Sequence, residues 1–78
     1  ATGNCTYVHT WSTSARSSTV SAITCSGARK VRAVLQYYSS SSGSTLYTNK
    51  GAWAGTGGVS HTSKAAPAVA VYGYAEKN

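Results

Sequence analysis

Short runs of strand-favouring residues, separated by stretches rich in serine and glycine, limit most strongly what this chain can fold into. Valine, isoleucine, threonine, tyrosine and tryptophan are frequent in residues 6–11, 19–25, 30–38, 45–48, 59–62 and 68–75. Such β-branched and aromatic side chains fit the pleated surface of a sheet. No segment shows a long helical period with caps at its ends. We therefore expect an all-β fold of about six or seven short strands.

Alternation within these runs predicts which side of each strand faces the core. In residues 30–38 the expected core side consists of Val31, Ala33, Leu35 and Tyr37. The opposite side consists of Lys30, Arg32, Val34, Gln36 and Tyr38. Packing such strands in layers predicts a small antiparallel β-sandwich of immunoglobulin-like type, or a barrel. Residues 49–51 are expected to form a turn, and an α+β domain with a helix over residues 64–71 is the alternative fold.

The length predicts one domain, residues 1–78, whose core is thin because a chain of this size buries only about 60–65% of its unfolded surface. Cys5 and Cys25 are the obvious covalent staple. A disulfide between them closes a loop of roughly 20 residues and adds about 3 kcal/mol to stability. Two free thiols in a cytosolic protein are the alternative.

The composition favours a secreted protein. Serine, threonine and glycine are abundant, methionine and phenylalanine are absent, and charged residues are few. The chain begins with Ala1 rather than methionine, which we interpret as removal of a signal peptide. No apolar run is long enough to span a bilayer.

A single acidic side chain, Glu76, stands against seven lysines and arginines. Glycosidases need two carboxylates, a Ser-His-Asp triad needs an acid, and Mg²⁺ or Ca²⁺ sites need several oxygen anions. We therefore expect no enzyme, no catalytic residue and no cofactor, and we expect the cations to find no acidic partner within the chain. His9 and His61, together with the cysteines, match no common zinc-finger spacing, so no metal is expected.

The densest basic cluster is Arg29, Lys30 and Arg32. Lys30 and Arg32 project from one side of their predicted strand, with Tyr38 further along it. Such a surface suits an acidic protein or a cell-envelope partner, or it is a solvated face that keeps the protein soluble. Specific nucleic acid recognition is disfavoured, because no zinc knuckle, RNP or helix-turn-helix signature is present.

Two further residues, Trp11 and Arg16, complete the candidate binding residues. Trp11 lies close to a polar loop that carries Arg16, and tryptophan is enriched where proteins bind partners. A core position is equally compatible with Trp11. Trp53 lies between two alanines and is expected in the core.

From Cys5 through the final strand, the chain resembles the small secreted actinobacterial α-amylase inhibitors of the tendamistat type. The shared features are the cysteine pair, a strand shortly after the second cysteine at residues 28–38, and Gly-Ala-Trp-Ala at residues 51–54. The resemblance implies a six-stranded β-sandwich that binds a hydrolase. The chain departs from the family at Trp11, which Ser12 and Thr13 follow in place of Arg-Tyr, and it lacks the second disulfide.

Residues 30–74 also resemble the β-sandwich bacteriocins of the lactococcin type. The shared features are a strand with a basic start, a Ser/Gly loop, Gly-x-Trp-Ala at residues 51–54 and a closing strand with Tyr72 and Tyr74. That family is secreted, basic and acts on cell-wall synthesis in competitors. Its tyrosine- and histidine-rich N-terminal half is not evident in this chain, and its members commonly lack this cysteine pair.

These observations predict a secreted, non-enzymatic binding protein. We expect an antimicrobial or otherwise antagonistic factor, or a component of one, that docks on an acidic target. One alternative is an inhibitor of an extracellular α-amylase or protease that presents residues 11–16 as a protruding loop. Another is an adaptor subunit of a larger secreted complex, since exposed sheet edges can pair with another chain.

Overall fold

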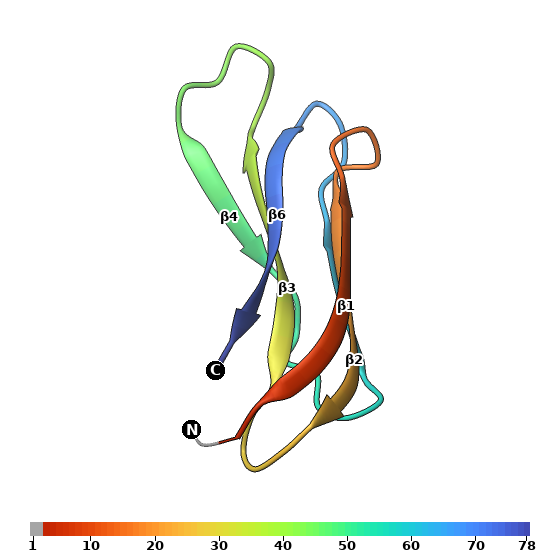
Figure 1. Cartoon of the computed structure of the whole chain (residues 1–78). Helices are drawn as coiled ribbons and strands as arrows, with labels where there is room; N and C mark the ends of the chain where they lie inside the picture. Colours follow the sequence, from red (N-terminus) through yellow and green to blue (C-terminus); the bar gives the residue numbers. More distant parts are fainter. Residues whose placement is uncertain (1–2) are drawn as a thin grey trace.

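The protein is a sandwich of two three-stranded antiparallel sheets, as its computed structural model shows (Figure 1). The structure describes residues 3–78, so Ala1, on which the expected loss of a signal peptide rests, lies outside the described residues. The strands are β1 (Cys5–Ser12), β2 (Ser17–Cys25), β3 (Val31–Tyr38), β4 (Leu46–Lys50), β5 (Val59–Ser63) and β6 (Val69–Lys77). Sheet A has the order β1-β2-β5 and sheet B the order β4-β3-β6. The predicted all-β sandwich is therefore confirmed.

The chain passes from one sheet to the other after β2, β4 and β5, whereas the β1–β2 and β3–β4 connections stay within a sheet. No helix occurs in residues 3–78, so none there could cross a membrane. The alternative helix over residues 64–71 is wrong, because residues 64–68 form the crossover to sheet B and β6 begins at Val69. Residues 52–54 form a single bridge, between Ala54 and Val31, and not a strand.

Small apolar side chains of the two central strands form the core. The buried members are Val20 and Ala22 on β2 and Val31, Ala33 and Leu35 on β3. The predicted core side of β3 is thus confirmed, although its fourth member, Tyr37, is half-buried. With so little volume in each side chain, the sheets must approach closely for these residues to stay in contact.

Polar side chains fill the rest of the space between the sheets. The buried Ser60 Oγ accepts a hydrogen bond from the Ala33 N–H (2.9 Å). Asn49 Nδ2 donates to the buried Thr62 Oγ1 (2.6 Å). These bonds satisfy groups that would be costly to bury alone, and they join sheet A to sheet B. The turn expected at residues 49–51 is wrong for Asn49 and Lys50, because both continue β4 opposite β3.

Val34 lies on the outer side of β3, yet it is completely buried. Its Cα partners are Lys50 on β4 and Tyr74 on β6. Neighbours in register lie close enough for long side chains to cover the residue between them. The outer face of sheet B is therefore a packed surface with its own buried residue.

The predicted disulfide between Cys5 and Cys25 is confirmed. It joins the first residue of β1 to the last residue of β2, which are Cα partners in the β1–β2 register. The disulfide therefore links β1 and β2 at the open end of their hairpin within sheet A and does not connect the two sheets.

Candidate binding surfaces

Charged side chains are confined to sheet B and to the loops at the two ends of the sandwich. Those on strands are Arg32, Lys50, Glu76 and Lys77, and those in loops are Arg16, Arg29, Lys30 and Lys64. The described strands β1, β2 and β5 contain no lysine, arginine, aspartate or glutamate. The net charge of +6 is therefore presented by one layer and by the ends, while the outer face of sheet A is uncharged.

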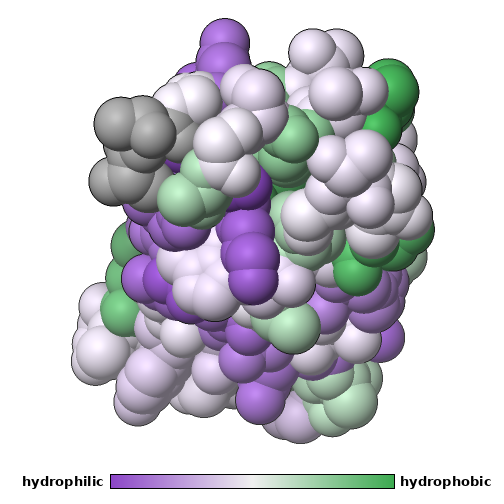
Figure 2. All heavy atoms as spheres, turned by 90° about the horizontal axis from the view of Figure 1, so that it is seen from below, coloured by the Kyte–Doolittle hydropathy of each residue, from purple (hydrophilic) through white to green (hydrophobic). Residues whose placement is uncertain are grey.

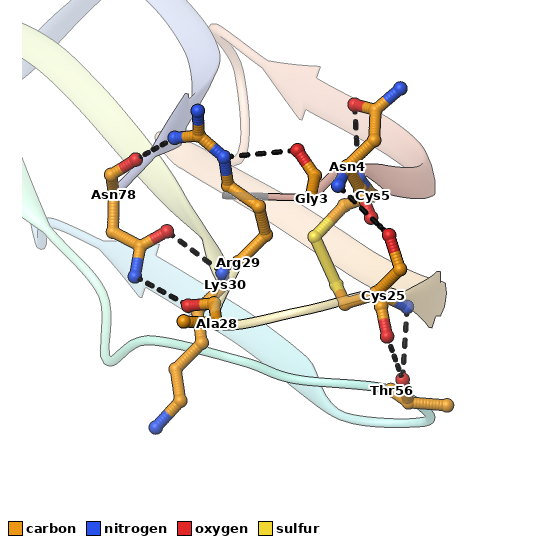
Figure 3. The surroundings of a disulfide bond; sticks show 10 residues. Gly3, Asn4, Cys5, Cys25, Ala28, Arg29, Lys30, Thr56 and Asn78 are labelled. Carbon is orange, nitrogen blue, oxygen red and sulfur yellow. Dashed lines mark hydrogen bonds between the residues drawn. A yellow bond between two sulfur atoms is a disulfide. The ribbon is translucent and has the colours of Figure 1, made fainter. Parts of the chain in front are cut away.

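The predicted cluster of Arg29, Lys30 and Arg32 is divided by the structure. Arg29 lies at the disulfide end of the sandwich, which we define by residues 26–30 and 55–58. Its Nε donates to the main-chain oxygen of Gly3 (3.1 Å), and its Nη1 donates to that of Asn78 (Figure 3). Lys30 N–H donates to Asn78 Oδ1 (2.9 Å). The Arg29 side chain thus ties the segment before β1 to the end of β6.

Two lysines remain exposed at the disulfide end. Lys30 precedes β3, and Lys77 is the Cα partner of Val31 at the start of that strand. Neither lysine has a carboxylate partner within residues 3–78. Figure 2 views the molecule from this end and shows hydrophilic atoms across its middle, with hydrophobic patches toward the margin. This end therefore offers free positive charge.

Arg32 and Lys50 share the one acidic side chain of the sequence, Glu76. Arg32 pairs with Glu76 Oε1, and Lys50 Nζ lies 3.4 Å from Glu76 Oε2. The expectation that no cation finds an acidic partner is wrong for these two, because the β3–β6 register places Glu76 opposite Arg32. Hydrogen bonding from Arg32, and then from Lys50, holds the pKa of Glu76 below its usual value despite some desolvation that raises it.

Trp53 lies beside Arg32 on the outer face of sheet B. The Arg32 Cζ atom is 4.0 Å from the centroid of the Trp53 ring, a cation–π contact. The predicted core position of Trp53 is wrong, since 39% of the residue is exposed. The reason is local: Ala54 is the buried residue that bridges to Val31, so the preceding Trp53 projects away from the core.

Aromatic rings continue along the exposed edge formed by β1 and β6. Tyr74 and Tyr72 stack with ring centroids 5.9 Å apart, and Trp11 meets Tyr72 edge-on at 5.5 Å. Trp11 is 41% exposed. Tyr38 lies further along the sheet, in register with Leu46 and Val69. Trp11 packs against Gly73 at the edge between the two sheets, whereas Arg32 and Tyr38 lie on β3 of sheet B, so these residues of the predicted site are not in one cluster.

A groove of about 310 Å³ lies at the opposite, turn end of the sandwich, which we define by residues 13–16, 39–45 and 64–68. It is lined by Tyr37, Tyr47 and Lys64 together with Ser39, Ala65, Pro67 and Ala68. The rings of Tyr37 and Tyr47, which are cross-strand partners, stack with centroids 5.7 Å apart. Lys64 Nζ lies 5.2 Å from the centroid of Tyr37.

Arg16 fixes the position of Lys64 in this groove. The Lys64 N–H donates to the Arg16 main-chain oxygen (3.0 Å), and Arg16 Nε donates to the Lys64 main-chain oxygen (3.1 Å). Arg16 has a left-handed backbone, with φ of 53°, which turns its side chain and carbonyl toward the crossover. The predicted binding residue is thus also a positioning residue for a cation that sequence reasoning did not single out.

The two histidines have separate local partners. His9 Nε2 and Ser18 Oγ are 2.9 Å apart, and Thr19 Oγ1 and His61 Nδ1 are 2.7 Å apart. Burial lowers the pKa of His9. Within the described part of the chain, no three histidine, cysteine, aspartate or glutamate side chains are placed to hold a metal ion.

No protein-family model matches this chain, and neither a curated protein nor a solved structure matches it. The likenesses to amylase inhibitors and to bacteriocins therefore stay predictions.

Proposed function

We propose that the protein is a secreted, non-catalytic binding protein that docks on an acidic partner through its cationic face. We define the cationic face as the outer side of sheet B with the exposed lysines of the disulfide end. The charge asymmetry of the fold carries this proposal. On this face Arg32 and Lys50 share Glu76, and beside them Lys30 and Lys77 have no aspartate or glutamate partner within residues 3–78.

The composition of the cationic face suits contact with a partner. Free lysines raise the rate of association with an acidic surface and make binding sensitive to salt. Trp53 and Tyr72 add exposed aromatic area, which contributes strongly to binding energy where a partner covers it. The outer face of sheet A carries no charged side chain, so attraction to an acidic partner comes from sheet B and from the ends of the sandwich.

An extracellular, antagonistic role is the use of this face that we propose. A disulfide persists in oxidising compartments, and the confirmed disulfide supports this setting. Cell envelopes carry anionic polymers and lipids, to which cationic surfaces are attracted. The acidic partner we propose is accordingly a component of the envelope of a competing cell, and the protein is an antimicrobial factor or a component of one.

The test compares two variants with the same net charge. Lys30→Gln/Lys77→Gln removes two cations from the cationic face, and Thr10→Glu/Ser21→Glu adds two acids to exposed positions on the outer face of sheet A. Each changes the net charge from +6 by two. Co-sedimentation with bacterial cell envelopes at low salt should fall several-fold for the lysine variant and much less for the sheet A variant. Equal losses would exclude the cationic face as the docking surface.

The two alternatives are separated by other assays. The hydrolase-inhibitor alternative requires residues 11–16 to form a protruding loop. In the structure, the Trp11–Tyr72 and Arg16–Lys64 contacts hold the two ends of this loop to the rest of the molecule. Stoichiometric inhibition of an α-amylase or a protease would establish that role. Co-purification of a second secreted chain would establish an adaptor role. Substrate turnover by the purified protein would contradict all three.

A further inference from the structure

We propose that the groove at the turn end binds a single carboxylate-bearing sugar of the hexuronic acid class, with its ring on Tyr47 and its carboxylate at Lys64. This inference goes beyond the proposed function. It concerns a different end of the molecule, and it stands even if the cationic face binds no acidic partner.

The charge of the groove favours a ligand with one negative charge. Among residues 3–78, Lys64 is the one charged residue that lines it, and Glu76 pairs with Arg32 and Lys50 elsewhere in sheet B. Lys64 is half-buried and is held by Arg16 at both its N–H and its main-chain oxygen. A phosphate would call for several converging donors, such as an arginine fork or a nest of backbone N–H groups. One ammonium group, on a side chain whose backbone is held in place, suits a carboxylate.

The aromatic rings of the groove favour a sugar ring. Lys64 lies over Tyr37, and Tyr47 is 46% exposed, so the neighbouring ring remains open to a ligand. The face of an aromatic ring is electron-rich and attracts the slightly positive C–H bonds of a pyranose. Tyr37, Tyr47 and Lys64 line the same groove, and the centroids of the two rings are 5.7 Å apart, so we expect a sugar on Tyr47 to bring its carboxylate to Lys64.

The remaining lining favours a polar ligand over an apolar aromatic acid. Ser39, Tyr37 and Tyr47 supply hydroxyl groups that can donate to and accept from sugar hydroxyls. The other members, Ala65, Pro67 and Ala68, are small, so no large aliphatic wall encloses the ligand. The volume of about 310 Å³ lies at the small end of ligand sites and fits a single unit.

The test is a titration of the full chain with galacturonic acid and with its methyl ester, followed by the NMR signals of Tyr37, Tyr47 and Lys64. The ester has the same ring and no charge. We expect the acid to bind with a dissociation constant of ~1 mM, and the ester to bind about tenfold more weakly, since a charge-assisted hydrogen bond is lost. Lys64→Gln should abolish the difference between acid and ester, whereas Lys30→Gln, with the same change in net charge, should preserve it.

A second pair of variants tests the sugar ring. Tyr47→Leu should weaken acid and ester alike by about tenfold, and Tyr72→Leu, which removes an exposed ring elsewhere, should change neither. Three results would overturn the proposal: no saturable shift at the groove, equal affinity of the native chain for acid and ester, or binding of 4-hydroxybenzoate in place of the sugar acid. The comparison of acid with ester needs no variant, so it stands even if a substitution disturbs folding.

Discussion

At the scale of single residues, Gly73 decides how closely β6 can approach β1. A Cβ atom at position 73 would lie 2.6 Å from Trp11 Cβ and 2.9 Å from Trp11 Cγ. Gly73→Ala should therefore lower the free energy of unfolding by about 1–3 kcal/mol, because the sheets must separate or Trp11 must move. Urea unfolding followed by tryptophan fluorescence measures the change.

The matched control for this substitution is Gly55→Ala. A Cβ at position 55 would have no neighbour within 4 Å, and the backbone there is not left-handed. This variant should be as stable as the native chain or slightly more stable, since alanine restricts the unfolded chain. If both alanine variants lost the same stability, close packing at Gly73 would not be the cause.

His9 gives the stability a dependence on pH near neutrality. Burial lowers its pKa in the folded state below the usual value of 6.5. The unfolded chain therefore binds more protons than the folded chain once the pH falls below about 6.5, so the folded state loses stability on acidification. Urea midpoints at about pH 7.5 and about pH 5.5 should show this loss.

The control for that experiment is His9→Gln, which can keep a hydrogen bond to Ser18 and cannot titrate. Its urea midpoint should differ less between the two pH values than that of the native chain. Glu76, whose pKa is also lowered, acts in the same direction only at more acidic pH, below its usual value of 4.5. An undiminished pH dependence in His9→Gln would show that another group is responsible.

Residue roles were predictable only where a single strand determines them. Alternation along one strand correctly placed Val31, Ala33 and Leu35 in the core. The environment of Trp53 depends on the bridge from Ala54 to Val31, and the partner of Arg32 depends on the β3–β6 register. Neither pairing can be recognised from the composition of the segments that take part in it, so both assignments required the structure.

At the scale of elements, the disulfide stabilises a hairpin whose strands are already paired along their length, apart from an irregularity at Ile23. The β1–β2 ladder extends from the pair Cys5 and Cys25 to the pair Ser12 and Ser17. Removing the bridge in Cys5→Ala/Cys25→Ala should therefore leave the folded structure intact. Its main effect should be to increase the conformational entropy of the unfolded chain. We expect a loss of about 3 kcal/mol in the free energy of unfolding.

Two measurements check this expectation. Circular dichroism should show the same strand content in the alanine variant as in the native chain, and its urea midpoint should fall. Reduction of the native chain with a thiol should give the same shift, because it breaks the same bridge without changing the other residues. Loss of the sheet signal in the alanine variant would show that the bridge holds the folded state itself together.

The strands were predictable, but their ends and pairings were less so. Each of the six predicted runs forms a strand, and the first and last residues of every strand lie within two residues of the predicted bounds. The prediction of a turn at residues 49–51 was wrong because Asn49 donates a hydrogen bond to Thr62 in the opposite sheet, which composition does not reveal. A turn-favouring residue can thus remain in a strand when a buried partner satisfies its amide.

At the scale of the whole molecule, the groove is assembled from three separate segments. Tyr37 comes from β3, Tyr47 from β4 and Lys64 from the crossover between β5 and β6. Sequence reasoning assigned Tyr37 to the core and did not identify Tyr47 or Lys64 as a site, because no spacing in the chain relates them. By contrast, the cationic character of the molecule was predictable from composition, since it needs no geometry.

The distribution of charge also makes the fold sensitive to ionic strength. The longest axis of the molecule is 43 Å, with Arg16 and Lys64 near the turn end and Arg29, Lys30 and Lys77 near the disulfide end. Electrostatic interactions extend about 30 Å at 0.01 M salt but only about 8 Å at 0.15 M. At low salt the charges are therefore screened only weakly over most of the length that separates the two ends. The ends repel each other, and this repulsion disfavours the compact state.

We expect the thermal midpoint of unfolding to rise when sodium chloride increases from about 0.01 M to about 0.15 M, because screening removes this repulsion. Salt also weakens the pair of Arg32 with Glu76, but that is one attraction against several repulsions, and partly exposed pairs contribute little. Lys30→Gln/Lys77→Gln should show a smaller rise, since it removes repulsive charge from one end. A midpoint that falls with salt would mean that local ion pairs outweigh the repulsion between the ends. A rise of the same size in the lysine variant would mean that Lys30 and Lys77 do not contribute to this repulsion.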